Sequence, residues 1–132
     1  MDLYTSGVRA TAGSLRAAVG PETVALRHAW TEEGVVAGPA ANGAQVLNLS
    51  VALCVLNDTY REAERLGITI DGVAVEADGG FDEDWKSTGI SYDVTIDSPA
   101  PVEDQARLAA VVDEVAEIPR VLRAGARVVR RG

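Results

Sequence analysis

The chain has very little cysteine and histidine, with one of each among its 132 residues. A single cysteine excludes a disulfide bond within the chain and any metal site built from several cysteines. A single histidine excludes a multi-histidine metal site and disfavours a serine–histidine triad. Phosphate loops and dinucleotide fingerprints are missing too, so we expect no cofactor and no metal. The sulfur chemistry open to this chain is therefore that of one thiol, Cys54.

Basic residues are also scarce, because 12 lysines and arginines stand against 20 acids and give a net charge of −8. This balance argues against nucleic acid as a main partner, since phosphate binding needs a basic surface. The charge is uneven: residues 57–117 hold 16 acids, whereas residues 118–132 hold five arginines and no acid. The two blocks can complement each other within one subunit or between two. Surface charge usually serves solubility, so we expect both to be solvated.

Long apolar runs are missing as well. The longest one, residues 46–56, includes Asn48 and Ser50 and is too short to span a bilayer. Residues 1–4 have neither the basic nor the apolar region of a signal peptide. These features predict a soluble, cytoplasmic protein with no membrane association. The length and a hydrophobic content of 47% predict one domain, residues 1–132, with a substantial core.

The first third of the chain has the pattern of short strands. Residues 7–11, 15–19 and 23–30 are separated by turn signals, and alternation is clearest in the third, where Val24, Leu26 and His28 share a face. Residues 33–43 are small and punctuated by glycine and proline, which predicts a loop.

A long helix is predicted from residue 42 or 43 to residue 66. Asn42 is a plausible N-cap and Gly67 fits the position after the last turn. The first three turns are apolar nearly all round, and a helix of that kind must be buried on every side. A small chain has difficulty doing this alone, so the helix predicts a homodimer.

The rest of the chain predicts a hairpin, a helix and a strand. Residues 68–77 and 90–96 are rich in β-formers around an acidic tip, residues 78–85. A second helix follows Pro101 and is broken at Pro119, and residues 126–129 read as a last strand. The order β-β-β-α-β-β-α-β, with strands and helices in separate runs, predicts an α+β fold with a long buried central helix.

Several stretches together resemble the OsmC-like family, which includes the organic hydroperoxide resistance proteins. They are residues 42–46 at the start of the long helix, residues 52–54 about three turns later, the junction 63–68, the strand 73–76, and the step 117–122. The resemblance is good from about residue 42 to the end and loose over residues 4–40. It implies an intertwined homodimer of α+β fold with two active sites at the subunit interface.

The resemblance also implies thiol-based reduction of peroxides, with Cys54 in the place of the peroxide-attacking cysteine. Ile118 stands where the resolving cysteine belongs, and Ala44 where the hydroperoxide resistance branch has a glutamate. The arginine of that branch comes from the first strands, where Arg16 is the nearest candidate and Arg9 the next. Apolar surroundings raise a thiol pKa, so Cys54 needs a positioned cation to react as a thiolate.

Two functions remain open on this pattern. The first is a stress-related reductase of organic hydroperoxides that works through Cys54 alone, with an external thiol as reductant. The alternative is a non-catalytic homodimer of this family that binds a small apolar ligand in the interface pocket. The retained cysteine favours the first, and the residues at positions 44 and 118 favour the second. An arginine in contact with the sulfur would support catalysis, and an entirely apolar shell would argue against it.

Other polar and aromatic residues have more ordinary interpretations. We expect His28 and Tyr60 to pack near the core, and the acidic tip to be solvated, because it lacks the spacing of a calcium loop. Aromatic side chains at a hairpin tip, such as Phe81 and Trp85, most often anchor the hairpin locally. Asn48 and Ser50 must find hydrogen-bond partners if they are buried.

Overall fold

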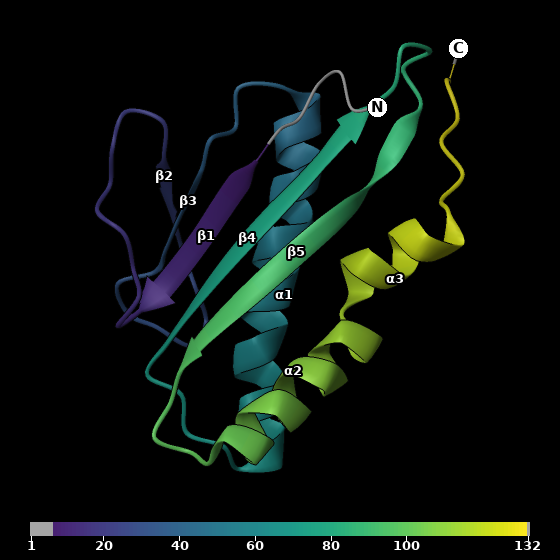
Figure 1. Cartoon of the computed structure of the whole chain (residues 1–132). Helices are drawn as coiled ribbons and strands as arrows, with labels where there is room; N and C mark the ends of the chain where they lie inside the picture. The colour runs from purple at the N-terminus through teal and green to yellow at the C-terminus, as the bar shows by residue number, and fades with distance from the viewer. Residues whose placement is uncertain (1–6, 132) are drawn as a thin grey trace.

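The computed structural model describes residues 7–131 and has an α+β architecture, as the sequence predicts (Figure 1). Residues 1–4, where no signal peptide was expected, lie outside the described part. Within residues 7–131, five antiparallel strands form one sheet in the order β2-β3-β1-β4-β5. In chain order, the strands and helices are β1 (Val8–Gly13), β2 (Val24–Leu26), β3 (Val35–Gly38), α1 (Gly43–Leu66), β4 (Gly72–Phe81), β5 (Ser87–Asp97), α2 (Val102–Val115) and α3 (Glu117–Ala124).

The central helix α1 forms where the sequence predicts it, and its caps explain both ends. The Asn42 side chain accepts a hydrogen bond from the backbone N–H of Gln45 at 2.9 Å. Gly67 ends the helix in the left-handed conformation at φ 70°, which glycine adopts without steric cost. No helix of the described residues is long and apolar enough to cross a membrane.

The core lies between α1 and one face of the sheet, and α2 packs beside α1 (Figure 1). Val55 and Leu56 of α1 are fully buried, as are Leu108 of α2 and Val73 of β4. The apolar start of α1 is not covered by the described chain, since Val46 is 52% and Leu47 37% exposed, whereas residues 48–63 are all buried or partly buried. A second subunit that covers this start of the helix therefore stays a prediction.

The hairpin of β4 and β5 is confirmed and is the longest strand pair of the sheet. The two strands run from the pair Gly72 and Asp97 to the pair Phe81 and Ser87, with a register irregularity near the tip. Asp82 organises the turn, because its carboxylate accepts hydrogen bonds from the backbone N–H groups of Asp84 and Lys86.

Two predictions in the first third of the chain are wrong. Residues 15–19 form no strand, and the loop predicted over residues 33–43 contains β3. Strand β3 lies between β2 and β1, and all four of its residues are buried. A short apolar run buried on both faces lacks the alternation that marks a half-exposed strand, and its flanking glycines read as loop signals.

The predicted last strand is also wrong, since residues 126–129 have no regular structure and α3 comes before them. The observed order is β-β-β-α-β-β-α-α. Pro119 does not end a helix here but lies in the first turn of α3. Proline is tolerated there because the first N–H groups of a helix have no partner within it.

Candidate functional site

Cys54 lies on α1, partly buried, beside a cavity of about 320 Å³. The cavity is formed by the middle of α1, the end of β2 with the segment that follows it, β3, and the start of α3. Its lining combines apolar and polar side chains: Leu26, Arg27, His28, Val35, Leu53, Cys54, Leu56, Asn57, Asp58 and Glu117. A small molecule of mixed character therefore has access to the sulfur.

Three groups surround the Cys54 sulfur. Asp58 Oδ2 and Glu117 Oε2 each lie 3.4 Å from Sγ, so the single S–H donates to one carboxylate at a time. The backbone N–H of Ile118 donates to Sγ at 3.5 Å. Asp58 follows Cys54 by one helical turn, and Glu117 and Ile118 arrive from the N-terminus of α3. The sulfur is thus bounded by two acids and one amide.

Arg61 is the cation of this cluster, and it contacts the carboxylates. Its Nη1 lies 3.2 Å from Asp58 Oδ1 and donates a hydrogen bond to Glu117 Oε1. Its Nε lies 3.1 Å from Glu62 Oε2. The structure therefore gives neither of the two expected environments: the shell of Cys54 is charged, and its arginine is separated from the sulfur by a carboxylate.

This arrangement keeps the thiol protonated. Burial is the main cause that raises the pKa of Cys54 to about 12, and the nearby Asp58 and Glu117 raise it further, while the Ile118 N–H opposes them. Burial and the hydrogen bond with Glu117 raise the pKa of Asp58. The hydrogen bonds from Asp58 and Arg61 hold the pKa of Glu117 at about 2.

The residues to which the family resemblance pointed lie at different distances from Cys54 in the structure. Ile118 does lie beside Cys54, but through its backbone. Ala44 is in the first turn of α1, ten residues or about 15 Å of helix before Cys54. Arg16 does not line the cavity, and its Nε is buried without a hydrogen-bond partner in the described chain. Arg9 pairs with Glu76 at 3.6 Å, away from this site. A role for Arg16 stays a prediction.

His28 and Tyr60 pack against each other at the inner side of the site. Their rings meet edge to face at 4.9 Å, and His28 Nδ1 lies 2.8 Å from Thr31 Oγ1. Burial lowers the pKa of His28, so the ring is neutral at physiological pH. Tyr60 is only 7% exposed. The packing interpretation of both residues agrees with these contacts.

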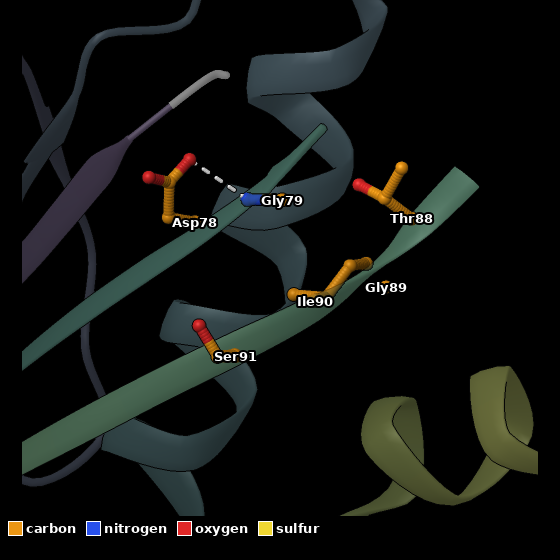
Figure 2. A pocket seen from close by; sticks show the side chains of 6 residues that line it. All are labelled: Asp78, Gly79, Thr88, Gly89, Ile90 and Ser91. Carbon is orange, nitrogen blue, oxygen red and sulfur yellow. Dashed lines mark hydrogen bonds between the residues drawn. The ribbon is translucent and has the colours of Figure 1, made fainter. Parts of the chain in front are cut away.

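A second cavity of about 260 Å³ lies in the β4–β5 hairpin and shares no residue with the first. Figure 2 shows its lining from Asp78 and Gly79 on β4 and from residues 88–91 on β5. The Asp78 carboxylate accepts a hydrogen bond from the Gly79 N–H at 2.8 Å (Figure 2). Asn48, which is 2% exposed, donates to Gly79 O at 3.5 Å and so finds the partner that its burial requires.

A metal ion is not needed to explain the acids around Cys54. The ligating atoms of Cys54, Asp58 and Glu117 do lie within 4.8 Å of one another. Arg61 already contacts both carboxylates and supplies the positive charge that a metal would bring. The expectation of a metal-free site stays a prediction.

Three of these residues were missed by the sequence analysis: Asp58, Arg61 and Glu117. Asp58 and Arg61 follow Cys54 by four and seven residues, which is a helical spacing on one face. That spacing was visible, but Glu117 lies 63 residues from Cys54 and joins them only through the fold.

Comparison with known proteins identifies the family. The family model described as OsmC-like protein matches residues 36–129. A solved structure of an OsmC-like hydroperoxide resistance protein from Jannaschia sp. CCS1 has a similar fold, with a TM-score of 0.57 and 18% identity. The similarity covers 96% of this chain and 91% of that one. No curated protein matches this sequence. The matched region includes Cys54 and the step at Ile118, and the chain belongs to the OsmC-like family.

Proposed function

We propose that this protein reduces organic hydroperoxides through Cys54 alone, as part of a stress response, with an external thiol as reductant. The observation that carries the proposal is the partly buried sulfur beside a cavity of about 320 Å³ with a mixed lining. Leu26, Leu53 and Val35 offer contacts to an alkyl group, while polar side chains lie close to the sulfur. Such a cavity suits a molecule with an apolar body and a polar end.

The reaction follows from the chemistry of one thiol. The Cys54 thiol loses its proton, and the thiolate attacks the outer peroxide oxygen as the O–O bond breaks. Cys54 becomes a sulfenic acid and the alkoxide takes up a proton to leave as an alcohol. One external thiol then forms a mixed disulfide with Cys54 and releases water. A second external thiol restores Cys54 and leaves as the oxidised disulfide. Ile118 at the resolving position is the reason for the external thiol.

The N-terminus of α3 supports this chemistry locally. The Ile118 N–H points at Sγ, and the positive end of a helix dipole favours a thiolate. The two carboxylates oppose it, since they raise the pKa of Cys54. We therefore expect a slow peroxidase in the arrangement described here.

The second candidate is a protein that binds a small apolar ligand in this cavity without turnover. The protonated state of Cys54 favours it, because a thiol at neutral pH is a poor nucleophile. Binding and catalysis use the same cavity, so a measurement at the sulfur separates them.

The deciding experiment is intact-mass spectrometry after exposure to a stoichiometric organic hydroperoxide, such as cumene hydroperoxide, with dimedone present to trap sulfenic acid. The first candidate predicts one dimedone adduct on the wild-type chain and none on Cys54→Ser. An unchanged wild-type mass, together with hydroperoxide that is not consumed, would reject catalysis and leave ligand binding. Sulfinic or sulfonic acid without an adduct would mean that no sulfenic intermediate persists long enough to be reduced.

We also propose the homodimer that the family implies. Val46 and Leu47 on α1 are exposed, as are Val24 (46%) and Leu26 (38%) on β2. A second copy that covers these exposed apolar residues would complete the burial of the start of α1. Sedimentation velocity should show a dimer for the wild type and a weakened dimer for Val46→Lys with Leu47→Lys. Val102→Lys, at a residue that is 76% exposed on α2, is the control. A wild-type monomer at micromolar concentration would contradict the proposal.

A further inference from the structure

Asp58, Arg61 and Glu117 form one connected cluster around Cys54, which we call the carboxylate cluster. Asp58 and Arg61 stand on α1, on the same face as Cys54, and Glu117 opens α3. Each carboxylate has one oxygen 3.4 Å from the sulfur, and its other oxygen contacts Arg61 Nη1. Both acids therefore lie directly between the sulfur and the guanidinium.

The carboxylate cluster is held from several sides. Asp58 is 1% exposed and also accepts a hydrogen bond from Asn57 Nδ2 at 3.2 Å. Arg61 is further held by Glu62, which in turn pairs with Arg65 Nη2 at 2.8 Å. Glu117 has a side chain that is 56% exposed and lines the cavity, so it is the member that a molecule in the cavity meets. Arg61 itself does not line the cavity.

The carboxylates lie between the Cys54 sulfur and the Arg61 guanidinium, and this order decides whether the cluster raises or lowers the pKa of the thiol. A carboxylate in contact with Sγ disfavours a second negative charge there, and Coulomb attraction to Arg61 is already satisfied by the acids. Without the negative charges, the same guanidinium would be the nearest cation to the sulfur among these contacts. It would then favour the thiolate.

We propose that Asp58 and Glu117 are positioning residues that hold Arg61 off the Cys54 sulfur, and that Arg61 becomes the activating cation of this chain once their charge is removed. Arg61 thereby takes the role that the family resemblance assigned to an arginine of the first strands. The inference deepens the proposed function, since it names the control of the same sulfur. Its primary test uses alkylation, which does not require peroxide chemistry.

The charged and titratable groups that face Cys54 come from three places. Asp58 and Arg61 belong to α1, and Glu117 belongs to α3. Arg27 and His28, from the segment after β2, line the same cavity. The lowered pKa of His28 keeps it neutral near pH 7, and Arg27 is unchanged by the substitutions below. A shift in the pH profile therefore reports on the carboxylate cluster.

The test is the rate of Cys54 alkylation by iodoacetamide as a function of pH, read by intact mass. Asp58→Asn with Glu117→Gln removes both charges and keeps both shapes. We expect the profile to move to lower pH by about one to three units, the range typical of a neighbouring charge. Adding Arg61→Met to this pair should move the profile back. Glu114→Gln, an exposed acid on the last turn of α2, is the matched control and should leave the profile unchanged.

Two results would overturn the inference: an unmoved profile in the double variant, or equal profiles with and without Arg61. Circular dichroism and thermal unfolding show whether each variant is folded. If Asp58→Asn does not fold, Glu117→Gln alone decides, because its exposed side chain is replaced without a buried change. It should shift the profile in the same direction by a smaller amount, and no shift would reject the inference.

Peroxide consumption by the same variants separates this inference from the proposed function. A shifted alkylation profile without peroxide consumption supports control by the carboxylate cluster and rejects the peroxidase. Peroxide consumption with an unshifted profile supports the peroxidase and rejects this control.

Discussion

Two clusters in this molecule share one design, an acidic hydrogen donor bound to a carboxylate that an arginine also holds. In the first, Tyr92 Oη donates to Asp113 Oδ1 at 2.6 Å, and Arg123 Nη2 contacts the same oxygen at 2.8 Å. In the second, Cys54 lies against Glu117, and Arg61 binds the other oxygen of Glu117. In both, the pKa of the donor is raised and that of the carboxylate is lowered.

The difference between the clusters lies in the donor and in what surrounds it. A tyrosine is neutral at pH 7 in any case, so the Tyr92 cluster only joins β5, α2 and α3. A thiol normally titrates near physiological pH, so the same arrangement changes what Cys54 can do. Cys54 also faces a second acid, Asp58, and a cavity. One electrostatic design therefore serves packing in one place and reactivity in the other.

The largest change in stability should come from breaking the Tyr92 cluster. Asp113→Ala removes the acceptor of Tyr92 and the partner of Arg123. Bonds of this kind contribute about 1.5–3 kcal/mol when shielded, and partial exposure reduces this to a loss of about 1–2 kcal/mol. Urea unfolding measures it, with Glu114→Ala as the control. The Cys54 alkylation profile should not move, and a moved profile would mean that the two clusters are coupled.

A smaller, pH-dependent change should follow from Glu117→Gln. The pKa of Glu117 is lowered from 4.5 to about 2 in the folded chain, by its hydrogen bonds with Asp58 and Arg61. A depressed pKa contributes stability above the unfolded value, and this contribution is lost as the pH falls from about 4.5 through about 2. The side chain is 56% exposed, so solvent screens the effect. The free energy of unfolding of the wild type and of Glu117→Gln should be measured at pH 7 and at pH 3. The difference between the two proteins should be smaller at pH 3. A gap that widens on acidification would contradict the sign.

The smallest effect should come from the exposed pair Arg9 and Glu76, which is a reference for both clusters. Its atoms lie 3.6 Å apart, and the side chains are 53% and 67% exposed. Arg9→Gln should change the free energy of unfolding by about 0–0.5 kcal/mol. A loss above about 1 kcal/mol would show that exposed pairs matter more in this protein than the comparison assumes.

The predictable parts of the fold were those with local signals. Asn42 and Gly67 fixed the ends of α1, and alternating β-formers around a polar turn fixed the β4–β5 hairpin. Strand β3 was missed because its apolar run is buried on both faces and flanked by glycine. Pro119 led to a second error. It was interpreted as the end of a helix, whereas it lies in the first turn of α3, where proline is tolerated.

The site was predictable only as far as the family resemblance reached. The resemblance singled out Cys54 and Ile118, and in the structure the backbone N–H of Ile118 donates to the Cys54 sulfur. The carboxylate cluster depends on α3 returning to the middle of α1, a contact between residues 63 positions apart. No spacing in the sequence encodes this return. The sign of the electrostatic effect on Cys54 therefore came from the structure.

The most direct test of this account is the pH dependence of Cys54 alkylation in the wild-type protein. Burial and the two carboxylates should keep the rate low from about pH 6 to about pH 9, with no plateau in that range. A free thiol is half ionised at its pKa of about 8.5, so its alkylation rate would rise steeply over the same range. A plateau near neutral pH would mean that a cation reaches the sulfur in the resting protein. That result would contradict the central claim that burial, together with Asp58 and Glu117, holds Cys54 as a thiol.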